Sequence, residues 1–248
     1  VAQKFHLYYL PFCPTAAVLN IGTSLTIEVE LDWDLLEKSI NKAIVRSEAM
    51  RVRLAKDKEG NWYQYVVDPE EQKIEFVDFS GGTMEEAEAQ MQKWTTVPFK
   101  MQDAPLIRIV MIRMPDGFCG VYFLAHHMIV DAQSLIAFLK DVIELYCHEK
   151  YEGVPYPKDM ASYIERLQKD LAYEAGSKAR QRDIDFFQKE IEKGEPIYNG
   201  IHGTDKLEAA RKMFGNPNLR TAFNASDDTK SALDIFHLEE EPTRRLMD

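Results

Sequence analysis

Short runs of alternating hydrophobic and polar residues recur along the first half of the chain. In the segment 25–31, Ile27 and Val29 fall on one face of an extended backbone, and Glu28 and Glu30 fall on the other. A period of two is typical of a strand with one buried face. We therefore predict a half-buried strand over this segment.

Turn sequences divide other apolar runs into hairpins. Lys-Glu-Gly-Asn at 58–61 separates two strand-like runs, and Pro-Asp-Gly at 115–117 separates two strongly apolar, β-branched runs. Gly, Asn and Asp accept the backbone angles of tight turns, so each arrangement predicts a β-hairpin. The predicted strands are 52–54 with 62–67, 106–114 with 118–125, and a separate alternating strand at 74–79.

Apolar residues at three- and four-residue spacing indicate amphipathic helices in four further segments. Asp32 is placed to cap the first helix, and Gly176 interrupts the last. From Gly194 to Ser226, glycine, asparagine, proline and charged residues replace the periodicity, which indicates a linker before a strand at 233–238. The predicted helices are the one that follows Asp32, then 85–94, 134–146 and 160–191.

These elements predict an α/β fold, specifically a two-layer α+β sandwich in which helices flank a mixed β-sheet. We assign residues 1–192 to this unit and 193–230 to a loop-rich linker. The 106–125 hairpin is expected at the centre of the sheet because both of its strands are strongly apolar.

Composition narrows the possible partners and location. The net charge of -11 and the lack of a dense Lys/Arg block argue against nucleic-acid binding. No apolar run approaches the roughly 20 residues that span a bilayer, so no membrane insertion is expected. The three cysteines form no CxxC pair, which favours a reducing compartment and predicts a cytoplasmic protein.

The candidate chemistry lies where the second strand of the central hairpin ends. The sequence there is His126-His127-Met128-Ile129-Val130-Asp131-Ala132. Histidine and aspartate four residues apart are weak evidence alone, but this pair lies between a buried strand and a helix. Such junctions commonly carry catalytic residues, because a rigid element holds one imidazole toward a cleft.

The motif resembles His-His-x-x-x-Asp-Gly of the condensation domains of nonribosomal peptide synthetases, which belong to the chloramphenicol-acetyltransferase-like superfamily. The segments 2–10 and 46–54 are similar to two further blocks of that family, in the same order. Weaker similarities lie at 97–108, 185–190 and 236–246. The resemblance implies that 1–192 is the N-terminal lobe of the family's pseudo-dimer and that 231–248 begins a second lobe.

The resemblance also implies roles for the motif residues. His127 would accept or position a proton of the attacking amine, and imidazole suits this task because its reference pKa is about 6.5. His126 would pack and form hydrogen bonds. Asp131 would brace the loop through an ion pair with an arginine, for which Arg46 is the first candidate and Arg51 the second.

The implied reaction joins an amine to an acyl group carried as a thioester on the phosphopantetheine arm of a peptidyl or acyl carrier protein domain. No bound cofactor is needed, and no metal is expected because His148, His202 and His237 are scattered. The missing second lobe is an expected partner. A single lobe would therefore be inactive alone and would be prone to self-association.

Two other functions stay open on the sequence. An epimerisation domain shares the doubled histidine and inverts the α-carbon of a tethered aminoacyl group. A catalytically degenerate domain would only dock carrier proteins or other synthetase modules. Ala132 in place of the family's Gly, and Ser47 in place of its His, favour the degenerate domain, whereas the presence together of His127, Asp131 and Arg46 favours an enzyme.

Overall fold

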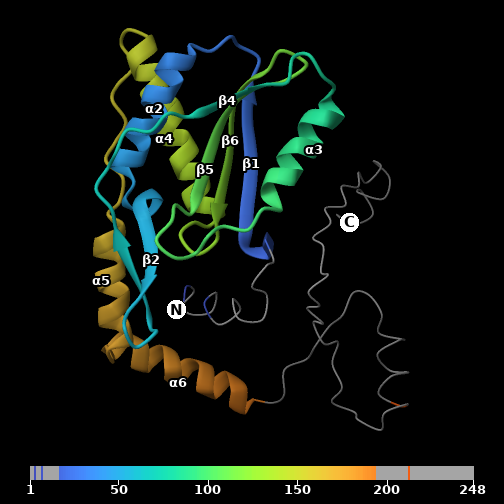
Figure 1. Ribbon diagram of the computed structural model, residues 1–248. Coiled ribbons are helices and arrows are strands. Elements are labelled where there is room, and N and C mark those ends of the chain that lie inside the picture. Colours follow the sequence, from blue (N-terminus) through green and yellow to red (C-terminus); the bar gives the residue numbers. More distant parts are fainter. Residues whose placement is uncertain (1–2, 4–6, 8–16, 194–211, 213–248) are drawn as a thin grey trace, which may run out of the picture.

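A computed structural model describes residues 3, 7, 17–193 and 212 of the chain, and Figure 1 shows their arrangement. A mixed β-sheet lies among helices, as the sequence predicted. The elements are β1 (Asn20–Ile27), α2 (Trp33–Arg46), β2 (Val52–Lys56), β3 (Trp62–Val66), β4 (Glu75–Asp78), α3 (Met84–Thr95), β5 (Ile107–Arg113), β6 (Cys119–His126), α4 (Ala132–Lys150), α5 (Tyr163–Glu174) and α6 (Lys178–Glu192), with 3-10 turns η1 (Ala17–Leu19) and η2 (Glu48–Arg51).

The main sheet has four strands in the order β1-β6-β5-β4. β6 is antiparallel to both β1 and β5, whereas β4 runs parallel to β5. The predicted central hairpin is confirmed as β5 and β6, and Gly117 in its turn has a φ of 87° that suits glycine. The second predicted hairpin is confirmed as the two-stranded sheet of β2 and β3.

Helices cover both faces of the main sheet. Figure 1 shows α2 and α4 on one face and α3 on the other. Phe123 of β6 belongs to the core beneath α2 and α4, whereas its neighbours Tyr122 and Leu124 pack in the cluster that includes Trp94 of α3. Every residue of β6 is buried for this reason, which makes the strand a rigid support for the motif at its end.

The helix ends follow the capping chemistry of the sequence. The Asp32 carboxylate accepts a hydrogen bond from the Leu35 amide at 3.0 Å and begins α2, as predicted. Thr83 and Glu86 form a capping box that begins α3. Gly176, with a φ of 109°, separates α5 from α6 and confirms the predicted break in the long polar segment.

The predicted strand at 25–31 is misplaced. β1 begins at Asn20 and ends at Ile27, and both Ile27 and Val29 are exposed. The cause is the length of the partner strand, because β1 pairs with β6 from Asn20 opposite His126 to Ile27 opposite Cys119, where β6 begins. Alternation beyond that point has no strand to pair with.

Several predictions fall outside the described residues. These are the linker at 193–230, except for Lys193 and Lys212, the strand at 233–238, and the second-lobe segment at 231–248. Most of the block at 2–10 also lies outside them, although Gln3 and Leu7 are described. Within the described residues, no helix is both long enough and apolar enough to cross a membrane.

Candidate active site

Backbone hydrogen bonds hold the motif loop against the end of the sheet on two sides. The amide of His126 donates to the Leu106 carbonyl at 2.9 Å, just before β5. The amide of His127 donates to the Leu19 carbonyl at 2.7 Å, just before β1. The Ile129 amide then donates back to the His126 carbonyl at 3.1 Å and closes a turn. The two histidines therefore have little freedom to shift along the chain.

His126 shapes the loop from inside. Its side chain is buried, and its Nδ1 accepts a hydrogen bond from the Met128 amide at 3.1 Å. A nitrogen that accepts a hydrogen bond carries no proton, so the ring is held as the tautomer protonated on Nε2. The Phe99 ring meets the imidazole edge-on, with the ring centroids 6.3 Å apart. These contacts support the packing and hydrogen-bonding role expected of His126.

His127 lies on the outside of the same turn. Its side chain is exposed at the end of β6, whereas Met128, Ile129 and Val130 are buried in the core. The loop thus anchors three apolar side chains and turns one imidazole outward. This is the position expected for His127, at the exposed end of the central hairpin. An imidazole so placed can exchange a proton with a bound substrate.

Among the residues that the structure describes, no arginine forms an ion pair with Asp131, and the expected pairing with Arg46 or Arg51 is not formed. The residue is exposed and caps α4, accepting hydrogen bonds from the Ser134 amide at 2.8 Å and the Ser134 hydroxyl at 2.5 Å. The Asp131 amide donates to the Ser134 hydroxyl at 2.7 Å, which completes a capping box. The carboxylate is thus turned to the helix end, where four amides otherwise lack partners.

The environment of Asp131 favours its charged form. Hydrogen bonds from Ser134 lower the pKa of the Asp131 carboxyl, burial opposes the shift, and a weaker electrostatic interaction with His127 adds to the lowering. Ala132 is the first residue of α4, and Asp103 is the one non-glycine residue with positive φ among those described. Ala132 therefore has ordinary backbone angles, and replacing the family's Gly with Ala does not strain the loop.

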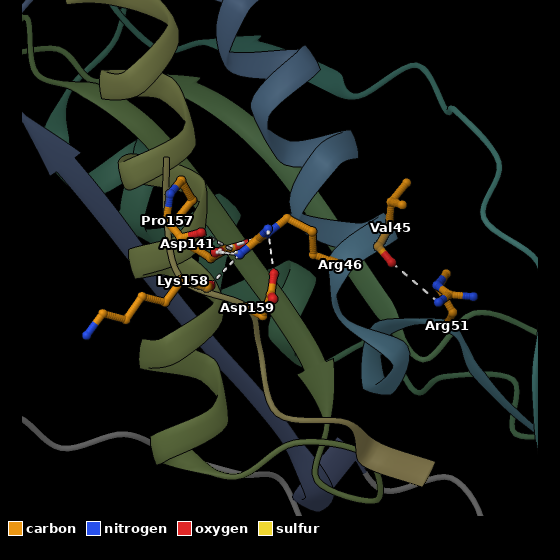
Figure 2. Close-up of polar contacts among 7 residues, drawn as sticks. All are labelled: Val45, Arg46, Arg51, Asp141, Pro157, Lys158 and Asp159. Atoms are coloured by element: carbon orange, nitrogen blue, oxygen red, sulfur yellow. Dashed lines mark hydrogen bonds and ion pairs between the residues drawn. The ribbon is translucent and has the colours of Figure 1, made fainter. Parts of the chain in front are cut away.

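Arg46 pairs instead with Asp141 of α4 (Figure 2). Its Nε lies 3.0 Å from one Asp141 oxygen and 3.3 Å from the other, and its Nη2 lies 3.2 Å from the latter. Nη2 also donates to the carbonyls of Pro157 and Lys158, at 3.3 and 2.5 Å. The hydrogen bond to Asp141 raises the pKa of Arg46. This pair fastens α2 to α4 and to the segment before α5.

Arg51, the second candidate partner, binds backbone carbonyls next to the β2–β3 hairpin and at the end of α2. Its Nη1 donates to the Val67 carbonyl at 2.5 Å and its Nη2 to the Val45 carbonyl at 3.4 Å, the contact drawn in Figure 2. Both arginines therefore hold backbone segments rather than the motif loop.

Among the residues that the structure describes, no group of histidine, cysteine and acidic side chains is arranged to hold a metal.

A doubled histidine motif at the end of a buried strand is a feature by which this chain can be compared with known protein families. The family model for the condensation domain matches residues 2–243, so the chain belongs to the condensation-domain family. A plipastatin synthase protein of Bacillus subtilis (strain 168) is 24% identical over 160 residues, which are 64% of this chain and 6% of that protein. Surfactin synthase subunit 1 of the same organism is 26% identical over 204 residues, 77% of this chain and 5% of that protein.

Solved structures share the fold. The starter condensation domain of rhizomide synthetase superposes with a TM-score of 0.69 at 19% identity, covering 79% of this chain and 48% of that one. The first condensation domain of the calcium-dependent antibiotic synthetase superposes with a TM-score of 0.68 at 20% identity, covering 86% and 56%. The chain therefore spans about half of these structures and a small part of its synthetase relatives. The predicted mixed sheet with flanking helices and the predicted family are confirmed.

One polar contact beside the motif was not predicted from the sequence. The side-chain amide of Gln3 donates to the Met128 carbonyl at 3.0 Å. The same amide also contacts the side chains of Gln64 and Tyr163. Gln3 lies in the segment that resembles the family's first block, but that resemblance assigned it no role. Nothing in the order of the chain brings Gln64 and Tyr163 to it. Asp141, the partner of Arg46, was missed for the same reason.

Proposed function

We propose that the protein that carries this chain forms amide bonds between an acyl or aminoacyl thioester and an amine, both carried on phosphopantetheine arms. Family membership supports this reaction class. The observation that carries the proposal is the exposed imidazole of His127 on a loop whose backbone is fixed by the Leu106 and Leu19 carbonyls. A base must be held in place and still reach a substrate, and His127 meets both conditions.

In the proposed step, the amine nitrogen attacks the thioester carbonyl carbon. A C–N bond forms and the C–S bond breaks, which releases the carrier thiol. The proton lost by the amine passes to the His127 imidazole and then to the departing sulfur, so the enzyme is unchanged at the end. Proton transfer of this kind contributes about 10²–10⁴-fold, and alignment of the two tethered substrates supplies the rest.

Asp131 has a different part in this proposal from the one that the resemblance implied. Its carboxylate begins α4, and its pKa is lowered mainly by the hydrogen bonds from Ser134. Asp131 would thus order the loop that presents His127, because its capping box fixes the start of α4.

The partners follow from the same proposal. Carrier protein domains present donor and acceptor, and a second lobe closes the substrate channel, so a single lobe would be inactive alone. A variant of the starter domain of rhizomide synthetase is described in complex with C8-CoA. CoA ends in the same phosphopantetheine arm that carrier proteins bear, which supports a thioester on this arm as the donor.

Product analysis tests the proposal. The full-length protein that carries this sequence is mixed with an acyl-loaded donor carrier and an amine-loaded acceptor carrier, and the acceptor is analysed by mass spectrometry. We expect an amide product and one free donor thiol for each bond formed. Inversion of an α-carbon without an amide would identify an epimerase instead, and carrier binding with no turnover would identify a docking domain. Either outcome would overturn the proposal.

A further inference from the structure

A cluster of three polar side chains holds the motif loop at a point next to His127. The side-chain amide of Gln3 donates to the Met128 carbonyl at 3.0 Å. The same nitrogen lies 2.8 Å from the Tyr163 hydroxyl and 3.0 Å from the side-chain oxygen of Gln64. The Tyr163 hydroxyl donates to that Gln64 oxygen at 2.6 Å. We name Gln3, Gln64 and Tyr163 the glutamine–tyrosine cluster.

The hydrogen bonds of the cluster have one consistent direction. The nitrogen of Gln3 has two hydrogens, of which one goes to Met128 and the other is shared between Tyr163 and Gln64. Burial raises the pKa of the Tyr163 hydroxyl, and the bonds from Gln3 and to Gln64 oppose the shift, so the hydroxyl is protonated at neutral pH and can donate. Met128 is thus bound to the cluster through its carbonyl.

The cluster joins parts of the chain that are far apart in sequence. Gln64 lies on β3, Tyr163 begins α5, and Gln3 lies near the start of the chain. Figure 1 shows α5 running beside the β2–β3 hairpin. The Glu48 carboxylate fixes this end of α5 by accepting hydrogen bonds from the Ser162 hydroxyl at 2.9 Å and the Ile164 amide at 3.0 Å. The position of Tyr163 is therefore set in part by Glu48 of η2 and by Gln64 of β3.

The cluster adds a further fixed point to the backbone around His127. The Leu19 carbonyl at the end of η1 holds the amide of His127, and Nδ1 of His126 holds the amide of Met128. The remaining polar group of that residue is the Met128 carbonyl, which the cluster holds. A displacement of this carbonyl would rotate the peptide that follows and tilt the neighbouring imidazole.

We propose that Gln3, Gln64 and Tyr163 are positioning residues, which hold the Met128 carbonyl so that the exposed imidazole of His127 faces the reacting amine. This inference rests on the proposed function, in which His127 is the base. It assigns the second hairpin and α5 a part in aligning the site, although neither carries the motif. None of the three residues touches the substrate in this proposal.

Hydrogen exchange of the chain tests the structural half of the inference. Gln3→Leu and Tyr163→Phe each remove part of the cluster, and we expect the amides of Met128 and Ile129 to exchange roughly fivefold to tenfold faster, as for loss of one hydrogen bond. The control is Tyr65→Phe, which removes a 2.9 Å hydrogen bond to Asp103 at the hairpin but leaves the cluster intact. Unchanged exchange in both cluster variants would overturn the inference.

Transfer kinetics of the full-length protein test the functional half. Tyr163→Phe should lower kcat about tenfold or more and leave KM within about twofold, because a small misplacement of the base affects the reaction and not binding. In a His127→Ala background, the same change should have no further effect on the residual rate. An equal loss in both backgrounds would show a purely structural role and would overturn the positioning inference.

The two proposals fail in different ways. Wild-type transfer by His127→Ala would refute His127 as the base, and with it the catalytic purpose of the cluster, even if exchange at Met128 rises. A large loss in His127→Ala, with unchanged kcat and exchange in Gln3→Leu and Tyr163→Phe, would leave the base in place and refute the positioning inference alone.

Discussion

The buried pair of Arg46 and Asp141 provides a quantitative test of the structure. The two side chains are 13% and 5% exposed. Replacing Asp141 with Ala leaves the guanidinium without its carboxylate, and breaking a buried ion pair in this way costs about 3–5 kcal/mol. The Pro157 and Lys158 carbonyls stay bound to Arg46, so we expect the lower end, about 3 kcal/mol.

Urea unfolding of the chain, followed by tryptophan fluorescence, measures this cost. With a slope of about 2 kcal/mol per molar, Asp141→Ala should lower the midpoint by about 1.5 M. Asp131→Ala removes the cap of α4 and should cost about 1 kcal/mol, which lowers the midpoint by about 0.5 M. Asp159 lies 4.0 Å from Arg46 but its side chain is fully exposed, so Asp159→Ala should leave the midpoint unchanged.

The ranking of the three variants by their loss of stability tests the pairing of Arg46 with Asp141. If Asp131→Ala were as destabilising as a broken buried pair and Asp141→Ala were nearly neutral, the arginine would belong to the motif loop, and the pairing described for Arg46 would be refuted. A double variant, Arg46→Met with Asp141→Leu, should recover much of the loss because no buried charge is then left unpaired. Failure to recover would show that the contacts of Arg46 with the carbonyls dominate.

Two further predictions concern packing and pH. A Cβ added at Gly120 would lie 1.9 Å from the Leu25 carbonyl oxygen, so Gly120→Ala should disrupt the pairing of β1 with β6 and cost about 2 kcal/mol or more. Gly81→Ala is the control, because the space around Gly81 is open. Thermal melts compare the two variants, and equal melting temperatures would contradict the register of β1 and β6. The hydrogen bonds from Ile164 and Ser162 lower the pKa of Glu48 below its ordinary 4.5. The stability that Glu48 adds is therefore present above pH 4.5 and is lost as the pH falls through the folded-state pKa. The difference in melting temperature between wild type and Glu48→Gln should shrink in that pH window, and a constant difference would refute this role of Glu48.

Local signals predicted most of the fold. The β5–β6 hairpin follows from two β-branched runs around Pro-Asp-Gly, and α2 follows from Asp32 and its apolar spacing. The strand β1 was misplaced because its end is set by Cys119 at the start of β6, a partner about a hundred residues away. Alternation shows that a segment can form a strand, but pairing decides where the strand ends.

In the candidate site, too, local features were predicted correctly and long-range contacts were not. The exposure of His127 and the burial of His126 agree with the sequence interpretation, because a strand end and a helix start are local features. The partner of Asp131 was predicted wrongly, although the spacing of Asp131 and Ser134 could have indicated a capping box. The pairing of Arg46 with Asp141 depends on how α2 lies against α4, which no local pattern encodes.

The most direct test of the central claim is transfer by His127→Ala in the full-length protein. Single-turnover rates are measured between a loaded donor carrier and an amine-bearing acceptor, alongside a thermal melt of each protein. We predict a loss of about 10²-fold or more at an unchanged melting temperature, because the exposed imidazole adds little packing. Transfer at the wild-type rate would contradict the assignment and would mean that alignment of the substrates, or another group, carries the reaction.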